Sequence, residues 1–425
     1  MSNNTPAPIS TLPLELIDRI INHVDSTSDI RRLTTVNRAT RLFANMRLWE
    51  FCHTQMLKEL ASYPNLVQQQ FASLIRTIDW NVARIDRWSF SHLQFPRVQE
   101  LSISNHEGQF GIVRLAQFIQ PALKNVRIMD YSRDINQVST NYIPLLVNCP
   151  ELRSLWIEID PQASDAEFLT TVTACRQLEH LVLEGPVCRV LKSQMFQYLA
   201  CQSRLQTFRY MAAGLRMTRN LIQPTMATLA PRQTIFNHLT SLRTGMDGAV
   251  ARELFPRMPT ITQLTLYIDQ HDDIINWLPH LPRLSSLSLV ARAEVWLTPL
   301  YLVGLQNLSL STLEIGGVDG CAFNGLLISV NDIDTIFGSH GTLNNLAVGW
   351  SGDATNITFL QHNPHLLIQR VVTQYPGLQS LILLEPCGPL NLRRMPRATL
   401  NGNLRYLDVE GIVAPGMDRN LRPQV

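Results

Sequence analysis

The chain has 425 residues, is 45% hydrophobic and only 16% charged, and carries a formal net charge of +2. This charge balance does not favour nucleic acid as a partner. No apolar run approaches the roughly 18 residues of a membrane span, and the N-terminus lacks the basic-then-apolar order of a signal peptide. We therefore expect a protein of the cytoplasm or nucleus, without a membrane contact, whose seven cysteines are reduced thiols.

A first amphipathic helix is predicted after a short N-terminal tail, residues 1–9, which we expect to be disordered. From Leu12 to Val24, six apolar residues recur at helical spacing. We expect Thr11 to cap this helix and Pro13 to lie in its first turn, where the missing N–H has no cost.

Two more short helices are predicted behind the first. Ser28 and Asp29 offer a cap for a helix that carries apolar residues over 30–36, and a third helix carries apolar residues over 42–49. We assign Trp49 to the core of this group. Because helices this short bury little surface among themselves, they must pack on a partner or on the rest of the chain.

The residues of these helices also form a motif. It consists of Leu12-Pro13-x-Glu15-Leu16, Ile20 and Ile21, Asp29-Ile30, Leu33, Val36-Asn37-Arg38 and Leu48-Trp49. This motif resembles an F-box, to which we assign residues 10–60. The resemblance implies binding to a Skp-type adaptor of a cullin-based ubiquitin ligase. It places the adaptor contact at Leu12, Pro13, Leu16, Ile17, Ile20, Leu33 and Val36.

A second pattern fills most of the remaining chain. An apolar residue, two others, an apolar residue, one other and an apolar residue recur thirteen times at intervals of 22 to 35 residues. The starts are Ile75, Val98, Leu123, Leu152, Leu178, Leu205, Leu239, Ile261, Leu284, Leu310, Leu343, Leu378 and Leu404. These intervals lie in the range of leucine-rich repeats or a little above it, and in such proteins each repeat adds one strand to a parallel sheet. We number this pattern from position 1, so that positions 1, 4 and 6 are apolar.

Two residue types keep the same phase. Six prolines lie two residues before position 1, where they end the preceding segment and favour an extended start of the strand. They are Pro96, Pro121, Pro150, Pro259, Pro282 and Pro376. Cys149, Cys175 and Cys201 lie three or four residues before position 1, which indicates packed thiols rather than a disulfide framework.

We therefore predict an α/β fold: the short three-helix F-box followed by a leucine-rich-repeat solenoid over 61–410 and a C-terminal cap over 411–425. The solenoid should have a curved parallel sheet, with helices or irregular segments on its convex side. Ser164 and Glu167 have the spacing of a helix capping box on that side. No asparagine ladder follows the strands, which leaves the turn structure open. We expect five leucines of the pattern to be almost fully buried: Leu181, Leu183, Leu264, Leu287 and Leu381.

Positions 3, 5 and 7 of each strand should face away from the core, because side chains alternate along a strand. On this concave face we expect the target protein to contact residues of the types that dominate binding interfaces. They are Arg127, Trp156, His180, Arg209, Arg243 and Tyr267. The arginines favour an acidic or phosphorylated target segment. The alternative is a solvated face on which arginines recur by chance.

The sequence contains no nucleophile elbow, no phosphate-binding lysine motif and no paired cysteines or histidines at metal-binding spacing. We expect no catalytic residue, no metal and no cofactor. The resemblance implies a non-catalytic, substrate-recognition subunit of an SCF-type ubiquitin ligase, which binds a target protein that the sequence does not identify. The alternative is a leucine-rich-repeat scaffold that binds proteins outside a ligase. Co-purification with a Skp-type adaptor separates the two.

Overall fold

The computed structural model describes residues 12–82, 90–105, 116–130, 143–158, 163–212, 216–230, 233–268, 273–291, 297, 299–316, 342–349, 364–384, 404–409 and 412–413. The chain divides into two compact units, Met1–Val190 and Leu191–Val425, each of which is described by itself. The expected cap Thr11, the tail 1–9 and most of the segment 411–425 lie outside the described residues.

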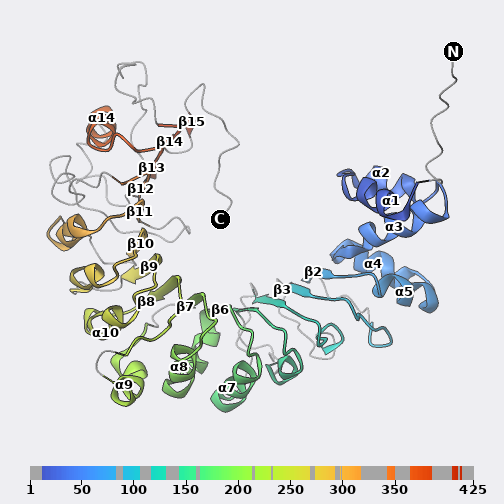
Figure 1. Cartoon of the computed structure of the whole chain (residues 1–425), viewed down its shortest axis with the longest axis horizontal. Helices are drawn as coiled ribbons and strands as arrows, with labels where there is room; N and C mark the ends of the chain where they lie inside the picture. Colours follow the sequence, from blue (N-terminus) through green and yellow to red (C-terminus); the bar gives the residue numbers. More distant parts are fainter. Residues whose placement is uncertain are drawn as a thin grey trace. The chain divides into compact units, whose positions relative to one another are not determined.

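Unit 1 begins with three helices, α1 (Leu14–Asn22), α2 (Thr27–Leu33) and α3 (Arg38–Glu50). Figure 1 shows them as one group. Pro13 is the N-cap of α1 rather than a residue of its first turn. The second helix starts earlier than predicted, because the Ser26 side chain, not Ser28, accepts a hydrogen bond from the Asp29 N–H. Asn37 caps α3 through a reciprocal capping box with Thr40.

The three helices enclose a small core of their own. Its buried members come from all three helices: Ile17, Ile21, Ile30 and Ala44. Trp49, at the end of α3, is buried as expected at 5% exposure, but it does not belong to the core of the three helices to which it was assigned. Its ring stacks on Phe71 with centroids 4.4 Å apart and meets Tyr63 edge-on. These two partners belong to the next part of the chain, so Trp49 joins the helices to the repeats.

The parallel sheet of unit 1 starts directly at the end of α3. Its strands are β1 (Phe51–His53), β2 (Thr77–Val82), β3 (Glu100–Asn105), β4 (Asn125–Asp130), β5 (Ser154–Ile157) and β6 (His180–Glu184). Each pairs in parallel with the next. Between strands lie α4 (Thr54–Ser62), α5 (Asn65–Ala72), η2 (Ile143–Asn148) and α7 (Asp165–Ala174), and η3 (Gly185–Val190) follows β6. The sheet therefore begins before residue 61, the predicted start of the repeats.

Unit 2 continues the same pattern. Eight parallel strands follow one another: β7 (Thr207–Met211), β8 (Ser241–Gly245), β9 (Gln263–Ile268), β10 (Ser286–Ala291), β11 (Thr312–Ile315), β12 (Asn345–Gly349), β13 (Ser380–Leu384) and β14 (Tyr406–Val409). Strand β15 (Ile412–Val413) pairs antiparallel with β14 and ends the sheet. All thirteen predicted strands, β2 to β14, are present.

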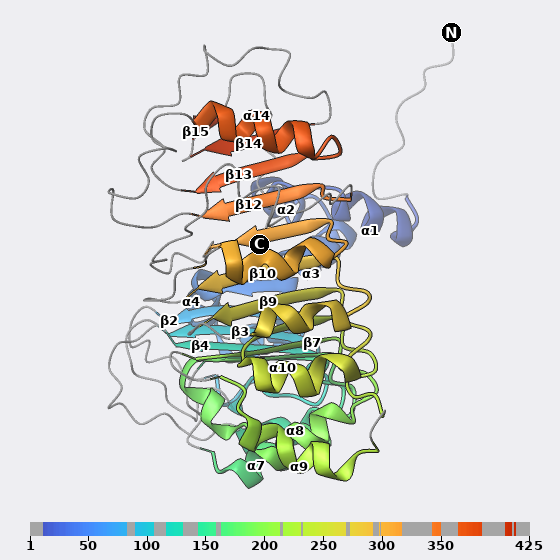
Figure 2. The same ribbon diagram turned by 90° about the vertical axis from the view of Figure 1, so that its left-hand side faces the viewer.

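Helical segments cover one side of the unit 2 strands, as Figure 2 shows for α10 and α14. They are α8 (Ser193–Ala200), α9 (Arg219–Thr228), α10 (Gly248–Leu254), η4 (Phe255–Arg257), η5 (Ile274–His280), α11 (Pro299–Leu302), η6 (Val303–Asn307) and α14 (Pro364–Gln374). The alternation of strand and helical segment within each unit fits the predicted solenoid.

The apolar positions of the repeats form the core. All five leucines named from the pattern are at most 2% exposed, which confirms the predicted burial. Positions 4 and 6 align across the sheet, as in the register of Leu264, Leu287 and Leu313. The capping box of α7 is also confirmed, because the Ser164 Oγ accepts from the Glu167 N–H and the Glu167 carboxylate accepts from the Ser164 N–H.

Position 2 carries a hydroxyl ladder in unit 2 that the sequence analysis missed. In four successive repeats a Ser or Thr hydroxyl at position 2 donates to the position 2 carbonyl of the preceding repeat. The donors Thr240, Thr262, Ser285 and Ser311 lie 3.0–3.2 Å from their acceptors. The same carbonyls accept backbone N–H groups of the next repeat. This ladder joins successive turns, as an asparagine ladder does in other repeat proteins. Its signal in the sequence was a Ser or Thr directly after the apolar residue at position 1 in four successive repeats.

The phased cysteines differ in burial. Cys149 and Cys175 are buried and their thiols donate to the carbonyls of Gln120 and Leu146. Burial raises the pKa of the Cys149 thiol to about 11 and that of Cys175 to about 12, so both stay protonated near neutral pH. Cys201 is exposed, which contradicts its predicted packing role, because it lies one residue further from the strand, at the C-cap of α8.

Candidate protein-binding surfaces

The three helices expose several large apolar side chains. Of the residues predicted to contact an adaptor, Leu16 and Ile20 are each 43% exposed, Val36 is 53% exposed and Pro13 is also exposed. Leu16 and Ile20 are one turn apart on α1, so they share one side of that helix. We call Leu16, Ile20 and Val36 the helical apolar patch.

Ile17 does not belong to this patch. It is 1% exposed and packs in the core of the three helices, so it cannot contact a partner without unfolding α1. Leu12 and Leu33 are partly buried against the same core, so only part of each side chain is accessible to a partner. Helical spacing alone does not separate these roles, because the five apolar residues within α1 cover more of the helix than one core-facing stripe requires.

Two further apolar residues of these helices are exposed, although neither was predicted to contact an adaptor. Leu14 in α1 and Leu42 in α3 are each 55% exposed. The sequence did contain a signal for their exposure: the three helices carry more apolar residues than their small core can enclose. Leu14 lies two residues before Leu16, on another side of α1, so it does not extend the helical apolar patch.

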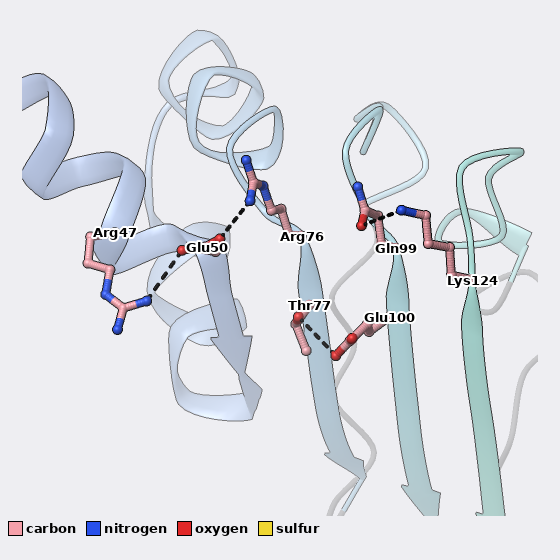
Figure 3. Close-up of polar contacts among 7 residues, drawn as sticks. All are labelled: Arg47, Glu50, Arg76, Thr77, Gln99, Glu100 and Lys124. Atoms are coloured by element: carbon pink, nitrogen blue, oxygen red, sulfur yellow. Dashed lines mark hydrogen bonds and ion pairs between the residues drawn. The ribbon is translucent and has the colours of Figure 1, made fainter. Parts of the chain in front are cut away.

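Glu50 links the end of α3 to the sheet through ion pairs and a backbone hydrogen bond. Its carboxylate lies 3.4 Å from an Arg47 nitrogen in α3 and 3.0 Å from an Arg76 nitrogen just before β2 (Figure 3). Its backbone carbonyl accepts the Arg76 N–H at 2.9 Å. Since β1 starts at the next residue, no flexible segment separates the helices from the first strands.

The open face of the unit 1 sheet, formed by positions 3, 5 and 7, is mixed in charge. The Arg127 guanidinium lies 3.6 Å from the centre of the Trp156 ring in the neighbouring strand, a cation–π contact. His180 is half-buried on the next strand. Four carboxylates occupy positions on the same face: Asp79, Glu100, Glu158 and Glu184. Arg127 therefore shares this face with several acidic residues, and its contact with a target protein stays a prediction.

Glu158 lies where two of these acids approach each other. Its pKa is raised, first by burial and then by the negative charge of Glu184. The positive charge of Arg127 and a hydrogen bond from Trp156 act in the opposite direction. The four side chains thus form one coupled group at the open face of unit 1.

The open face of unit 2 has two arginines side by side. Arg209 and Arg243 are paired in register on β7 and β8, and both are half-buried. The Arg243 Nε lies 2.7 Å from the Tyr267 hydroxyl, to which it donates, and 3.0 Å from the Met211 sulfur. Beyond β9 the face carries small residues such as Ser286, Ser288, Thr312, Asn345 and Ala347, as predicted.

Tyr267 differs from its predicted role as a target contact. It is 2% exposed, because the last three residues of β9, Leu266, Tyr267 and Ile268, are all buried and the alternation of faces breaks down there. Tyr267 instead accepts a hydrogen bond from the Arg243 guanidinium through its hydroxyl group.

Within the described residues, no cluster of metal-binding side chains occurs, and no helix there has the length and apolar character needed to cross a membrane.

No family model matches the sequence, and no curated protein matches it. Among solved structures, the chain aligns with one from the crystal structure of the Rad7 and Elc1 complex in yeast. The identity is 13%, over 93% of each chain, with a TM-score of 0.40. A leucine-rich-repeat protein of Leptospira interrogans aligns at 13% identity over 76% of this chain and 93% of that chain, with a TM-score of 0.27. Since likeness at this level carries no functional argument, we infer function from the residues of this chain.

Proposed function

We propose that the chain is the substrate-recognition subunit of an SCF-type ubiquitin ligase. Residues 10–60 act as an F-box that binds a Skp-type adaptor, and the open faces of the repeats bind a target protein. The observation that carries the proposal is the helical apolar patch. Leu16, Ile20 and Val36 stay 43–53% exposed although the three helices already have a core of their own.

An exposed apolar patch favours a partner, because covering it removes apolar surface from water, at about 25 cal/mol per Å². The adaptor contact in this proposal comprises Leu16, Ile20, Val36 and Pro13, and the exposed Leu42 on α3 is a further candidate. Ile17 supports it from within the core.

A receptor acts by holding two proteins near each other, and the junction at Glu50 and Trp49 suits this task. A flexible linker would leave the distance between adaptor and target variable. Here α3 ends at Glu50 and β1 begins at the next residue, so no such linker is present between them. Catalysis in this proposal belongs to other subunits.

The open faces supply the target contacts. In unit 2, Arg209 and Arg243 are neighbours, and two guanidinium groups together hold an acidic or phosphorylated segment. In unit 1, Trp156 and His180 contribute contacts, while Arg127 is occupied by the Trp156 ring.

A pull-down with a Skp-type adaptor tests the proposal. The variant carrying Leu16→Asp and Ile20→Asp should lose the adaptor, because two carboxylates would be buried at the contact. Leu66→Asp is the matched control, since Leu66 is 83% exposed on α5 outside the patch. If the unmodified chain captures no adaptor, a protein-binding scaffold outside a ligase becomes the better explanation.

A further inference from the structure

The turns that precede the strands of unit 1 carry a series of basic residues. Arg76, Lys124 and Arg153 occupy position 2 before β2, β4 and β5, and Arg97 and Arg176 lie one and two residues before position 1 of β3 and β6. We call these five residues the basic rim. Figure 3 shows Arg76 and Lys124 at the starts of their strands, with Gln99 between them. Arg97 and Arg176 are exposed, and the Arg153 side chain is 52% exposed.

The fold does not require cations at these positions. In unit 2 the same position 2 is filled by Thr240, Thr262, Ser285 and Ser311, whose hydroxyls join successive repeats. Like charges on adjacent strands reduce stability. The basic rim therefore has a cost for folding that the uncharged ladder avoids, which favours a role in binding.

Carboxylates offset only part of this charge. Glu50 lies near Arg47 and Arg76, and the Glu179 carboxylate is 3.9 Å from Arg153. Lys124 donates to the neutral Gln99 side chain at 3.1 Å. Arg97 has no carboxylate within ion-pair distance in the part of the chain that the structure describes.

A cavity of about 230 Å³ lies at the α3 end of the rim. Arg47, Arg76 and Arg97 line it together with the apolar side chains of Phe43, Met46 and Leu74. The carboxylates of Glu50 and Asp18 also line it, so the positive charges exceed the negative ones by one. Each guanidinium has five N–H donors, and Glu50 meets only one nitrogen of Arg47 and one of Arg76. Donors remain for one more carboxylate, and the apolar walls suit its methylene stem.

We propose that the basic rim binds an acidic, extended segment of a partner protein, with one carboxylate seated in the cavity among Arg47, Arg76 and Arg97. Adjacent strand starts are about 4.8 Å apart, so carboxylates along an extended segment reach successive rim residues. The formal net charge of the chain, only +2, does not favour nucleic acid as the occupant.

Fluorescence anisotropy with a labelled decaglutamate peptide tests this proposal on the full chain. Arg97→Glu with Lys124→Glu should weaken binding by about ten-fold or more, and the affinity of the unmodified chain should fall steeply between about 25 and 250 mM salt. The matched control is Arg283→Glu with Arg405→Glu, which makes the same charge change at the same repeat positions in unit 2. The control should bind within about two-fold of the unmodified chain, because its residues lie outside the rim.

Three results would overturn the proposal. They are equal losses in the rim and control variants, absence of saturable binding to the unmodified chain, and tighter binding of a single-stranded decanucleotide than of the peptide. Circular dichroism checks folding of both variants. If charge reversal unfolds the chain, Arg97→Gln with Lys124→Gln is compared with Arg283→Gln and Arg405→Gln by the same criteria.

Discussion

The carboxylate of Glu50, the last residue of α3, lies 3.0 Å from a guanidinium nitrogen of Arg76, which precedes β2. The two residues are far apart in the sequence, and their ion pair ties the helices to the repeats. Both side chains are a third to a half exposed, so solvent screens the pair.

We expect Glu50→Gln to lower the free energy of unfolding by about 1 kcal/mol or less. The substitution keeps the size of the side chain but leaves Arg47 and Arg76 without their shared carboxylate. Urea denaturation measures the change, with Asp29→Asn as the control for a more exposed pair within α2. A loss above about 3 kcal/mol would contradict a screened pair and indicate a buried one.

The hydroxyl ladder predicts a difference between two threonines of the same repeat. Thr262→Val removes a hydroxyl that donates to the Thr240 carbonyl, and we expect a loss of about 1 kcal/mol. Thr265→Val is the control, because Thr265 lies half-buried on the open face of β9, outside the ladder. Urea denaturation of both variants provides the comparison. Equal effects would mean that the ladder adds no stability.

The raised pKa of Glu158 predicts a pH dependence. A carboxyl whose pKa is higher in the folded chain than in the unfolded chain binds protons more tightly when folded. Its contribution to stability is therefore lost as the pH rises from the unfolded value through the folded one. Relative to Glu158→Gln, the unmodified chain should lose stability as the pH rises above the ordinary pKa of a glutamate, about 4.3.

Glu184→Gln supplies the control for this effect. Its charge contributes to the shift, so its removal should lower the pKa of Glu158 and reduce the pH dependence. Denaturation midpoints measured across the pH range test both statements. The same pH dependence in Glu158→Gln and in the unmodified chain would refute the assignment to Glu158.

The two arginines of unit 2 give a prediction for target binding. Arg209→Glu with Arg243→Glu should abolish capture of an acidic or phosphorylated target while adaptor binding stays intact. Arg127→Glu should have a smaller effect, since Arg127 stacks on Trp156 beside Glu158. Quantitative mass spectrometry of co-purified proteins measures both. Undiminished capture by the double variant would move the target contact away from β7 and β8.

The sequence predicted the strands well, because the apolar residues that form the core also set the register. Each of the thirteen repeats contributes the expected strand. Side-chain roles were harder to predict where the same helical spacing is compatible with both a buried and an exposed position. Ile17 and Ile20 both fit the apolar side of α1, yet only Ile17 enters the core, because that choice depends on how α2 and α3 pack.

Strand alternation failed at a different point. It placed Tyr267 on the open face, but the end of β9 is buried on both sides. The acidic surroundings of Arg127 were also hard to foresee, since Glu158 and Glu184 come from separate repeats and approach each other only through the sheet register. Three residues of the basic rim, Arg76, Lys124 and Arg153, share position 2 with the hydroxyl ladder, a relationship that is seen only when the repeats are aligned.

The most direct test of the adaptor contact is amide hydrogen exchange of the full chain with and without a Skp-type adaptor. We predict added protection in α1 and in the segment around Val36 and Leu42, with no change along the strands of either open face. Absence of protection in α1, or protection confined to the open faces, would contradict the proposal that the helical apolar patch binds the adaptor.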